Sequence, residues 1–159
     1  FLTRVPWGEL DYLVIDLPPG TGDAQLTLTQ MAPLTGAVIV TTPQDVALID
    51  ARKGLEMFRK VRVPVFGIVE NMSYFEPAPG QRHYLFGQGG GRKLAEQAGV
   101  PFLGELPIDP RVATCGDAGE PIVKRHPDSP IAAAYRQIAA TVAAAAKKHH
   151  DAALPMVDL

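Results

Sequence analysis

The sequence predicts an α/β fold with a mostly parallel sheet and flanking helices. Four short runs rich in β-branched and other apolar residues, at 11–17, 36–42, 65–70 and 102–106, show little polar alternation. Such runs are typical of strands that are buried on both faces of a parallel sheet. Segments with helical features separate the runs, and alternation of strand and helix indicates an α/β fold with right-handed crossovers.

The helices between the first three runs differ in the strength of their pattern. Residues 23–31 are a helix candidate between the first and second runs. Residues 46–60 carry a clear apolar stripe, with charged residues away from it. The stripe consists of Leu48, Ala51, Leu55 and Phe58.

A shorter helix is predicted over residues 91–98, because Gly99 is placed to end it and Pro101 prevents its continuation. Two long stretches, at 72–88 and 109–128, are predicted to be loops. Loops of this length inside a compact domain are often functional.

The last helix has the clearest start. Ser129 is placed as its N-cap, and Pro130 as its first residue, where a missing N–H costs nothing. We expect residues 1–148 to be the C-terminal part of one domain, with residues 149–159 as a flexible tail. The predicted apolar face of the helix consists of Ile131, Ala134, Tyr135, Ile138, Val142 and Ala145.

Composition limits the classes of function. The 159 residues suffice for one domain, and a formal net charge of −2 gives no general basic field for nucleic acid. No apolar run approaches the roughly 20 residues of a membrane span. A single cysteine favours a reducing, cytoplasmic location. Because the chain begins with Phe1 and enters a predicted strand within a dozen residues, we expect an upstream part to be missing, by truncation or processing.

The strongest chemical signal is DLPPGTGD at residues 16–23. Asp16 is placed at the carboxyl end of the first run, where α/β sheets bind ligands. An Asp there can hold Mg²⁺ through its water shell. Gly20 would let a main-chain N–H approach a phosphate closely, and Thr21 could add a hydroxyl. An ordinary turn, with Asp16 as its cap, is the alternative.

This motif is part of a longer resemblance. In order and spacing, residues 7–145 resemble the Mrp-type iron–sulfur cluster carriers, which are P-loop ATPases of the MinD/ParA group. The stretches that carry the resemblance are DYLVIDLPPGTGD (11–23), GAVIVTTPQDVALIDARKGLEMF (36–58), GIVENMSYF (67–75), FGQGGGRKLAEQAGVPFLGELPIDP (86–110) and GDAGEPIV (116–123).

The resemblance implies roles for the first motif. Asp16 would be the Walker B acid near Mg²⁺, and Gly20 the switch II glycine that senses the γ-phosphate. Pro19 and Thr21, on either side of Gly20, would border the bound nucleotide. Asp23 would complete the catalytic segment, although an acid in the first turn of a helix is favourable by itself.

The resemblance also implies a base-binding end. Asn71 would hydrogen-bond to the adenine edge, and Pro107 and Asp109 would flank the base. No carboxylate closely follows Asn71 in Met72-Ser73-Tyr74, which favours ATP over GTP. A turn-forming Asn and an Asp-Pro turn are the alternatives for Asn71 and Asp109.

Two family features are absent from this sequence. No G-K-G-G-V-G-K-[ST] phosphate loop is present, and the glycine-rich run at residues 87–91 is interpreted as a flexible helix entry. The chain alone is therefore expected to bind ATP poorly and to be marginally folded. The C-x-x-C pair that would share a [4Fe–4S] cluster between two chains is also missing from residues 75–84. Cys115 is expected to be a buried or idle thiol, so we predict no cluster ligand in this chain.

The resulting hypothesis is an ATP-hydrolysing homodimer in iron–sulfur cluster assembly or transfer, with apoprotein clients or assembly factors as partners. The aromatic loop at residues 74–86 is the candidate dimer or cargo surface, with packing over the sheet end as the alternative. Two other functions stay open. One is a MinD/ParA-like positioning ATPase, which the Ala-rich last helix disfavours, because a membrane helix would need an amphipathic basic face. The other is a degenerate scaffold without enzymatic activity.

Overall fold

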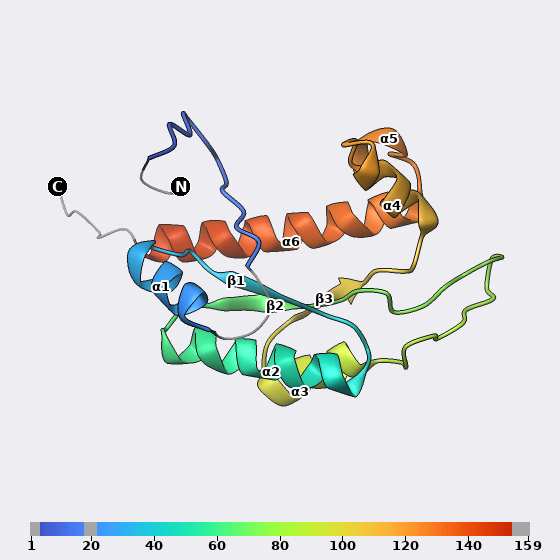
Figure 1. Ribbon diagram of the computed structural model, residues 1–159, viewed down its shortest axis with the longest axis horizontal. Coiled ribbons are helices and arrows are strands. Elements are labelled where there is room, and N and C mark those ends of the chain that lie inside the picture. The colour runs from blue at the N-terminus through green and yellow to red at the C-terminus, as the bar shows by residue number, and fades with distance from the viewer. Residues whose placement is uncertain (1–3, 18–21, 154–159) are drawn as a thin grey trace.

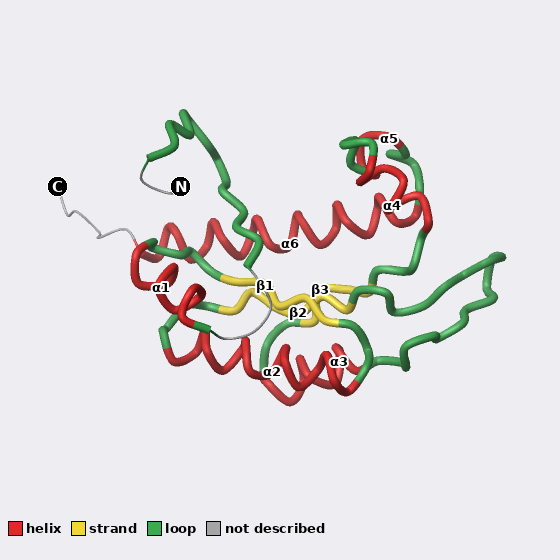
Figure 2. The backbone as a smooth tube through the Cα atoms, viewed as in Figure 1, coloured by secondary structure: helices red, strands yellow, loops and turns green. Residues whose placement is uncertain are grey.

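A three-stranded parallel sheet lies between two helical layers in the computed structural model, which describes residues 4–17 and 22–153 (Figure 1). The strands are β1 (Ala37–Thr41), β2 (Val65–Glu70) and β3 (Phe102–Glu105), in that order across the sheet. The tube view shows them stacked as adjacent strands at the centre of the molecule (Figure 2). The predicted α/β class with a parallel sheet is confirmed.

Helices α2 (Asp45–Lys60) and α3 (Gly90–Ala98) cover one face of the sheet. Their apolar residues and the strands form one core cluster, in which Leu55, Ile68 and Leu94 are almost completely buried. The predicted stripe of α2 faces this core, because Ala51, Leu55 and Phe58 are buried there and Leu48 packs against them. A left-handed Gly99 ends α3, as the sequence predicts.

Helix α6 (Pro130–Ala153) covers the opposite face of the sheet (Figure 1). Its residues Ala134, Tyr135, Ile138 and Val142 pack against a second core cluster of Val69, Leu103 and Leu106. Ser129 caps the start of α6, since its Oγ accepts a hydrogen bond from the N–H of Ala132 at 3.3 Å. The helix continues to Ala153, so residues 149–153 of the predicted tail are helical, and residues 154–159 lie outside the described residues.

The stretch 109–128 is not the long loop that the sequence predicts. It contains α4 (Pro110–Asp117) and α5 (Ile122–Arg125). Asp109 caps α4 and Pro110 is its first residue, so an Asp-Pro pair interpreted as a turn is a helix start. Both helices pack with the first turns of α6 around Cys115, Ile122 and Ile131.

The predicted strand at residues 11–17 is wrong for this structure. These residues form no strand, and Tyr12, Leu13 and Val14 are exposed, Val14 to 90%. A strand forms only where a neighbouring strand makes hydrogen bonds to its main-chain N–H and C=O groups. Within the described residues β1 pairs with β2 alone, so nothing pairs with this run. Helix α1 (Asp23–Met31) follows with the predicted bounds.

Candidate functional site

The carboxyl ends of β2 and β3 form the best-defined part of the candidate site. The N–H of Leu106 donates to the carbonyl oxygen of Glu70 at 2.8 Å, and the N–H of Ser73 donates to that of Leu106 at 3.0 Å. The N–H of Ile108 donates to the carbonyl of Tyr74 at 2.7 Å. This ladder extends beyond the strands and brings Asn71 and Pro107 to the same edge of the sheet.

Asn71 is held by its main chain and its side chain. Its N–H donates to the carbonyl of Thr41 at 2.7 Å, and its Oδ1 accepts from the N–H of Met72 at 3.0 Å. Met72 has a positive φ of 54°, which is uncommon for a residue other than glycine. The side-chain oxygen thus forms the turn that the sequence left open as an alternative. A contact between Asn71 and adenine stays a prediction.

Asp109 is engaged within its own segment. Its carboxylate accepts from the main-chain N–H of Arg111 at 2.9 Å and from Nη2 of the same arginine at 2.6 Å. These contacts hold the pKa of the Asp109 carboxyl below its usual range, with the side-chain hydrogen bonds from Arg111 as the largest cause. The predicted base-flanking role is untested, and helix capping is its visible role.

The first motif is only partly described. Asp16 is exposed, and next to it Leu17 packs against the core cluster beneath α2 and α3. Pro19, Gly20 and Thr21 lie outside the described residues, as does the side chain of Asp23, the first residue of α1. The structure therefore leaves the predicted catalytic roles as predictions.

Asp16 nevertheless has the chemistry that a magnesium site requires. Mg²⁺ commonly binds to one or two carboxylates and keeps several waters, and an exposed carboxylate leaves room for them. Across the described part of the chain, no group of three or more His, Cys, Asp and Glu side chains is placed to hold a metal ion by itself. The exposed Asp16 carboxylate would thus fit a Mg²⁺ ion that keeps most of its water shell.

The long loop between β2 and α3 is ordered by its own contacts and projects from the sheet (Figure 1). Phe75 and His83 exchange two main-chain hydrogen bonds of 2.8 Å. The Glu76 carboxylate accepts from the N–H of Gly80 at 2.8 Å and from Nε of Arg82 at 3.2 Å. These contacts lower the pKa of Glu76, with the Gly80 N–H as the largest cause.

Aromatic and cationic side chains meet on this loop. The Arg82 guanidinium lies 4.2 Å from the ring centroid of Tyr74, and the rings of Tyr74 and Tyr84 meet edge to face at 6.4 Å. Partial burial raises the pKa of Tyr74. Tyr74 thus packs against Arg82 on one side and meets Tyr84 within the loop. The role of the loop as a dimer or cargo surface stays a prediction.

Cys115 is 2% exposed and packs between Ile122 and Ile131. A thiol that is buried among apolar side chains is a poor cluster ligand, because metal binding needs an accessible thiolate. The predicted buried thiol is thus confirmed, and the absence of an iron–sulfur ligand from the chain stays a prediction.

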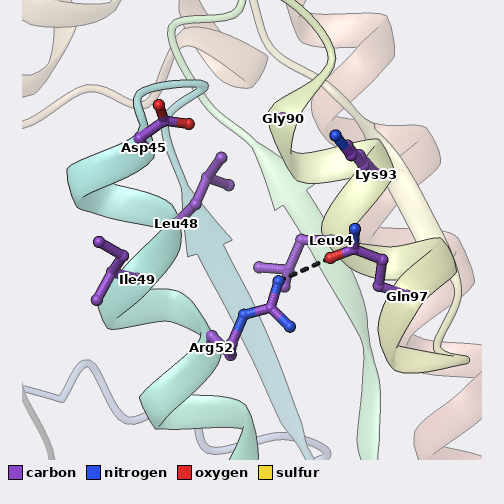
Figure 3. A pocket seen from close by; sticks show the side chains of 8 residues that line it. All are labelled: Asp45, Leu48, Ile49, Arg52, Gly90, Lys93, Leu94 and Gln97. Atoms are coloured by element: carbon purple, nitrogen blue, oxygen red, sulfur yellow. Dashed lines mark hydrogen bonds between the residues drawn. The ribbon is translucent and has the colours of Figure 1, made fainter.

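A surface hollow of about 350 Å³ lies between α2 and α3 (Figure 3). Leu48, Ile49 and Leu94 line it, and Arg52 crosses it to donate a hydrogen bond of 2.7 Å to Gln97. None of the predicted site residues lines this hollow. It is distinct from the carboxyl edge that Asn71 and Pro107 share.

Sequence reasoning missed Glu70, whose side chain is buried at the same edge. The available signal was an acid within the otherwise apolar run at residues 65–70, which the prediction treated only as the end of a strand. Its contacts are described below.

A parallel α/β sheet with polar residues beyond its carboxyl ends is typical of nucleotide-binding proteins. Solved structures that resemble the chain share this fold, and one of them is a nucleotide-binding protein. The nucleotide-binding protein of Archaeoglobus fulgidus, in complex with ADP, is 51% identical, with a TM-score of 0.65 over 74% of this chain and 49% of that one. The cell division ATPase MinD of Pyrococcus furiosus, 24% identical, shares the fold, with a TM-score of 0.53 over 68% of this chain and 42% of that one.

The family model of the ParA group that is described as NUBPL iron-transfer P-loop NTPase matches residues 1–143. The chain belongs to this family. It is 59% identical over 144 residues to the iron-sulfur cluster carrier protein of Deinococcus radiodurans, an alignment that covers 90% of this chain and 41% of that protein. The family expected from the sequence is confirmed. The chain spans between about two fifths and half of the length of these relatives.

No helix among the described residues is long and apolar enough to cross a membrane.

Proposed function

We propose that the protein to which this chain belongs binds and hydrolyses ATP and acts in the assembly of iron–sulfur clusters or their transfer to apoproteins. The observation that supports this most strongly is the family match over residues 1–143, together with a relative that carries the name iron-sulfur cluster carrier protein. The ADP in the related structure from Archaeoglobus fulgidus supports nucleotide binding by this protein.

The chain contributes two parts of such a site. Asn71 and Pro107 lie on one edge and would contact the base, while Asp16 would hold the water shell of Mg²⁺. Bound Mg²⁺ supplies charge neutralisation at the phosphates. Asp16 would orient that ion, and residues 16–23 would respond to the γ-phosphate by becoming ordered. The phosphate-loop lysines and N–H groups of the family would come from another part of the protein.

Binding of an iron–sulfur cluster needs thiolate ligands. Residues 1–159 do not offer them, because the single cysteine is buried. We propose that the protein works as a cytoplasmic homodimer and that cluster or client contacts use the loop at residues 74–86. That loop is accessible: His83, Tyr84 and Leu85 are all exposed.

The test uses the longer protein to which we propose this chain belongs. In that protein, Asp16→Ala is compared with Asp11→Ala. Asp11 is an exposed carboxylate in the same segment and serves as a matched control. We expect Asp16→Ala to lower the rate of Mg²⁺-dependent ATP hydrolysis at least about a hundredfold, because charge stabilisation at the phosphates depends on the ion. Asp11→Ala should remain close to the unmodified protein.

The same samples are then assayed anaerobically for transfer of a reconstituted iron–sulfur cluster to an apoprotein acceptor. The proposal predicts slower ATP-dependent transfer for Asp16→Ala. Unchanged hydrolysis in Asp16→Ala would contradict the ATPase assignment. Normal hydrolysis without any cluster transfer by the unmodified protein would instead contradict the proposed cargo.

A further inference from the structure

Glu70 is a buried acid at the point where the long loop leaves the sheet. The residue is 1% exposed, and its Oε2 accepts a hydrogen bond from the main-chain N–H of Gly91 at 2.5 Å. Its Oε1 has no hydrogen-bond partner among the described residues. Burying an incompletely bonded carboxyl group lowers stability, so a residue of this kind calls for an explanation other than packing.

The Gly91 contact joins the two ends of the loop. The chain leaves β2 at Glu70, projects away from the sheet, and returns at the first turn of α3, which begins at Gly90 (Figure 1). The Glu70 side chain therefore binds the residue at which the loop returns.

The main chain of Glu70 is tied to two further elements. Its carbonyl oxygen accepts from the N–H of Leu106 and from Oγ of Ser73, each at 2.8 Å. One residue thus connects the end of β2, the extension of β3, the first turn of the loop and the start of α3. Asn71, the predicted adenine contact, is the next residue along the chain.

The glycine-rich run provides the surface that the carboxylate contacts. A Cβ on Gly91 would lie 3.0 Å from Cβ and 3.1 Å from Oε2 of Glu70. A Cβ on Gly90 would lie 2.6 Å from the carbonyl oxygen of Pro43. Within the run interpreted from sequence as a flexible helix entry, Gly90 and Gly91 are thus closely packed, whereas a Cβ on Gly89 would meet nothing within 4 Å.

We propose that Glu70 is a positioning residue that fixes Asn71 and the root of the loop together, so that nucleotide occupancy and loop order are coupled. The part of this proposal that concerns nucleotide binding rests on the proposed function. ATP held at Asn71 restrains the end of β2, and the Glu70 carboxylate passes that restraint to Gly91 and the returning end of the loop. A bound client that orders the loop favours the nucleotide-binding position of Asn71 in the same way.

The test measures amide hydrogen exchange of peptides from residues 72–91 in the longer protein, with and without ATP. Glu70→Ala removes the acceptor for the Gly91 N–H, and we expect exchange in the loop to rise about tenfold or more without nucleotide. We also expect ATP to slow exchange of the loop in the unmodified protein and to have no such effect in Glu70→Ala.

Two variants separate positioning from general stability. Glu70→Gln retains an oxygen that can accept from Gly91, so exchange should stay within about threefold of the unmodified protein. Glu105→Gln is the matched control: Glu105 pairs with Glu70 in register and also contacts α3, with 3.5 Å between its Oε1 and Nη2 of Arg92. Its carboxylate contacts Arg92 and not Gly91, so Glu105→Gln leaves the Glu70–Gly91 contact in place and should leave loop exchange unchanged.

Loop exchange in Glu70→Ala within about twofold of the unmodified protein would overturn the inference, as would an intact ATP effect in that variant. ATP binding by the unmodified protein without any change in the loop would also overturn it. If Glu70→Ala does not fold, Gly91→Ala disturbs the same contact from the other side and should give the same exchange pattern. Failure of the unmodified protein to bind ATP would contradict the proposed function instead, and exchange without nucleotide would still decide whether Glu70 fixes the loop.

Discussion

Among individual residues, Asp109 shows how one carboxylate can define a helix. Its carboxylate accepts a hydrogen bond from the main-chain N–H of Arg111 at the start of α4 and forms an ion pair with the guanidinium of the same residue. Its side chain is 15% exposed, so these bonds are partly protected from water. An Asp at an N-cap satisfies a main-chain donor that otherwise has no partner within the helix.

We predict that Asp109→Ala lowers the free energy of unfolding by about 1 kcal/mol at neutral pH, the usual effect of losing such a cap. Urea unfolding of both proteins measures the difference. Asp128→Ala is a suitable control, because Asp128 is exposed and has no ion pair among the described residues. Equal losses in the two variants would show that the cap contributes nothing specific.

The effect should also depend on pH. Because the folded state lowers the pKa of Asp109, its contribution is complete above the unfolded pKa, about 4, and is lost as the pH falls through the lower folded pKa. The difference between the unmodified protein and Asp109→Ala should therefore shrink on acidification. A difference that grows on acidification would contradict this assignment.

Single residues were the hardest features to predict from sequence. Asn71 was placed correctly at the end of a strand, but its side-chain oxygen accepts a hydrogen bond from the N–H of Met72, a local contact that competes with the predicted contact to adenine. Glu70 was missed because its partner, Gly91, is 21 residues away and no local pattern connects them. Contacts between distant main-chain and side-chain atoms follow from the fold and not from spacing.

Secondary-structure elements were predicted well where tertiary partners lie within the chain. The apolar runs of β1, β2 and β3 and the stripe of α2 were sufficient, since each packs against another described element. Local capping signals also located α3 and α6. Helix α4 was missed because Asp109-Pro110 was interpreted as a turn, although the pair is equally suited to begin a helix.

The run at residues 11–17 does not form a strand because no described strand lies beside it to accept and donate main-chain hydrogen bonds. We predict that it becomes a strand in the longer protein. In residues 1–159 alone, the amides of Leu13, Val14 and Ile15 should exchange rapidly, whereas in the longer protein their exchange should slow about a hundredfold or more. Hydrogen exchange with peptide resolution makes the comparison.

The amides of Ile68 and Val69 provide the internal standard, because β2 is paired on both sides in this structure. They should be protected in both proteins. Rapid exchange at residues 13–15 in the longer protein would show that this run remains outside the sheet.

For the molecule as a whole, exposed apolar surface is the feature that most favours self-association. Trp7, Leu10 and Tyr12 are exposed, and so is Val40 on β1, to 60%. Within the described residues β1 pairs with β2 alone, which leaves its other edge unpaired. Unpaired edges and exposed apolar residues promote association between chains.

We predict that residues 1–159 alone bind ATP at least about tenfold more weakly than the longer protein and unfold at lower denaturant concentration. Calorimetric titration with Mg²⁺ and ATP, alongside urea unfolding of both proteins, tests this. The comparison should be made at several protein concentrations, since self-association would raise apparent stability. Equal ATP affinity of the two proteins would show that residues 1–159 carry a complete nucleotide site.

The main-chain pairing of Phe75 with His83 in the projecting loop affects which changes of sequence and length the loop can accept. The Phe75–His83 pair closes the segment between them, and the entropy of closing a loop rises only slowly with its length. Residues inserted or deleted around Gly80 would change the outer tip without shifting the sheet. The tip is therefore suited to diversification by natural selection and to the attachment of a fluorescent reporter by an engineer.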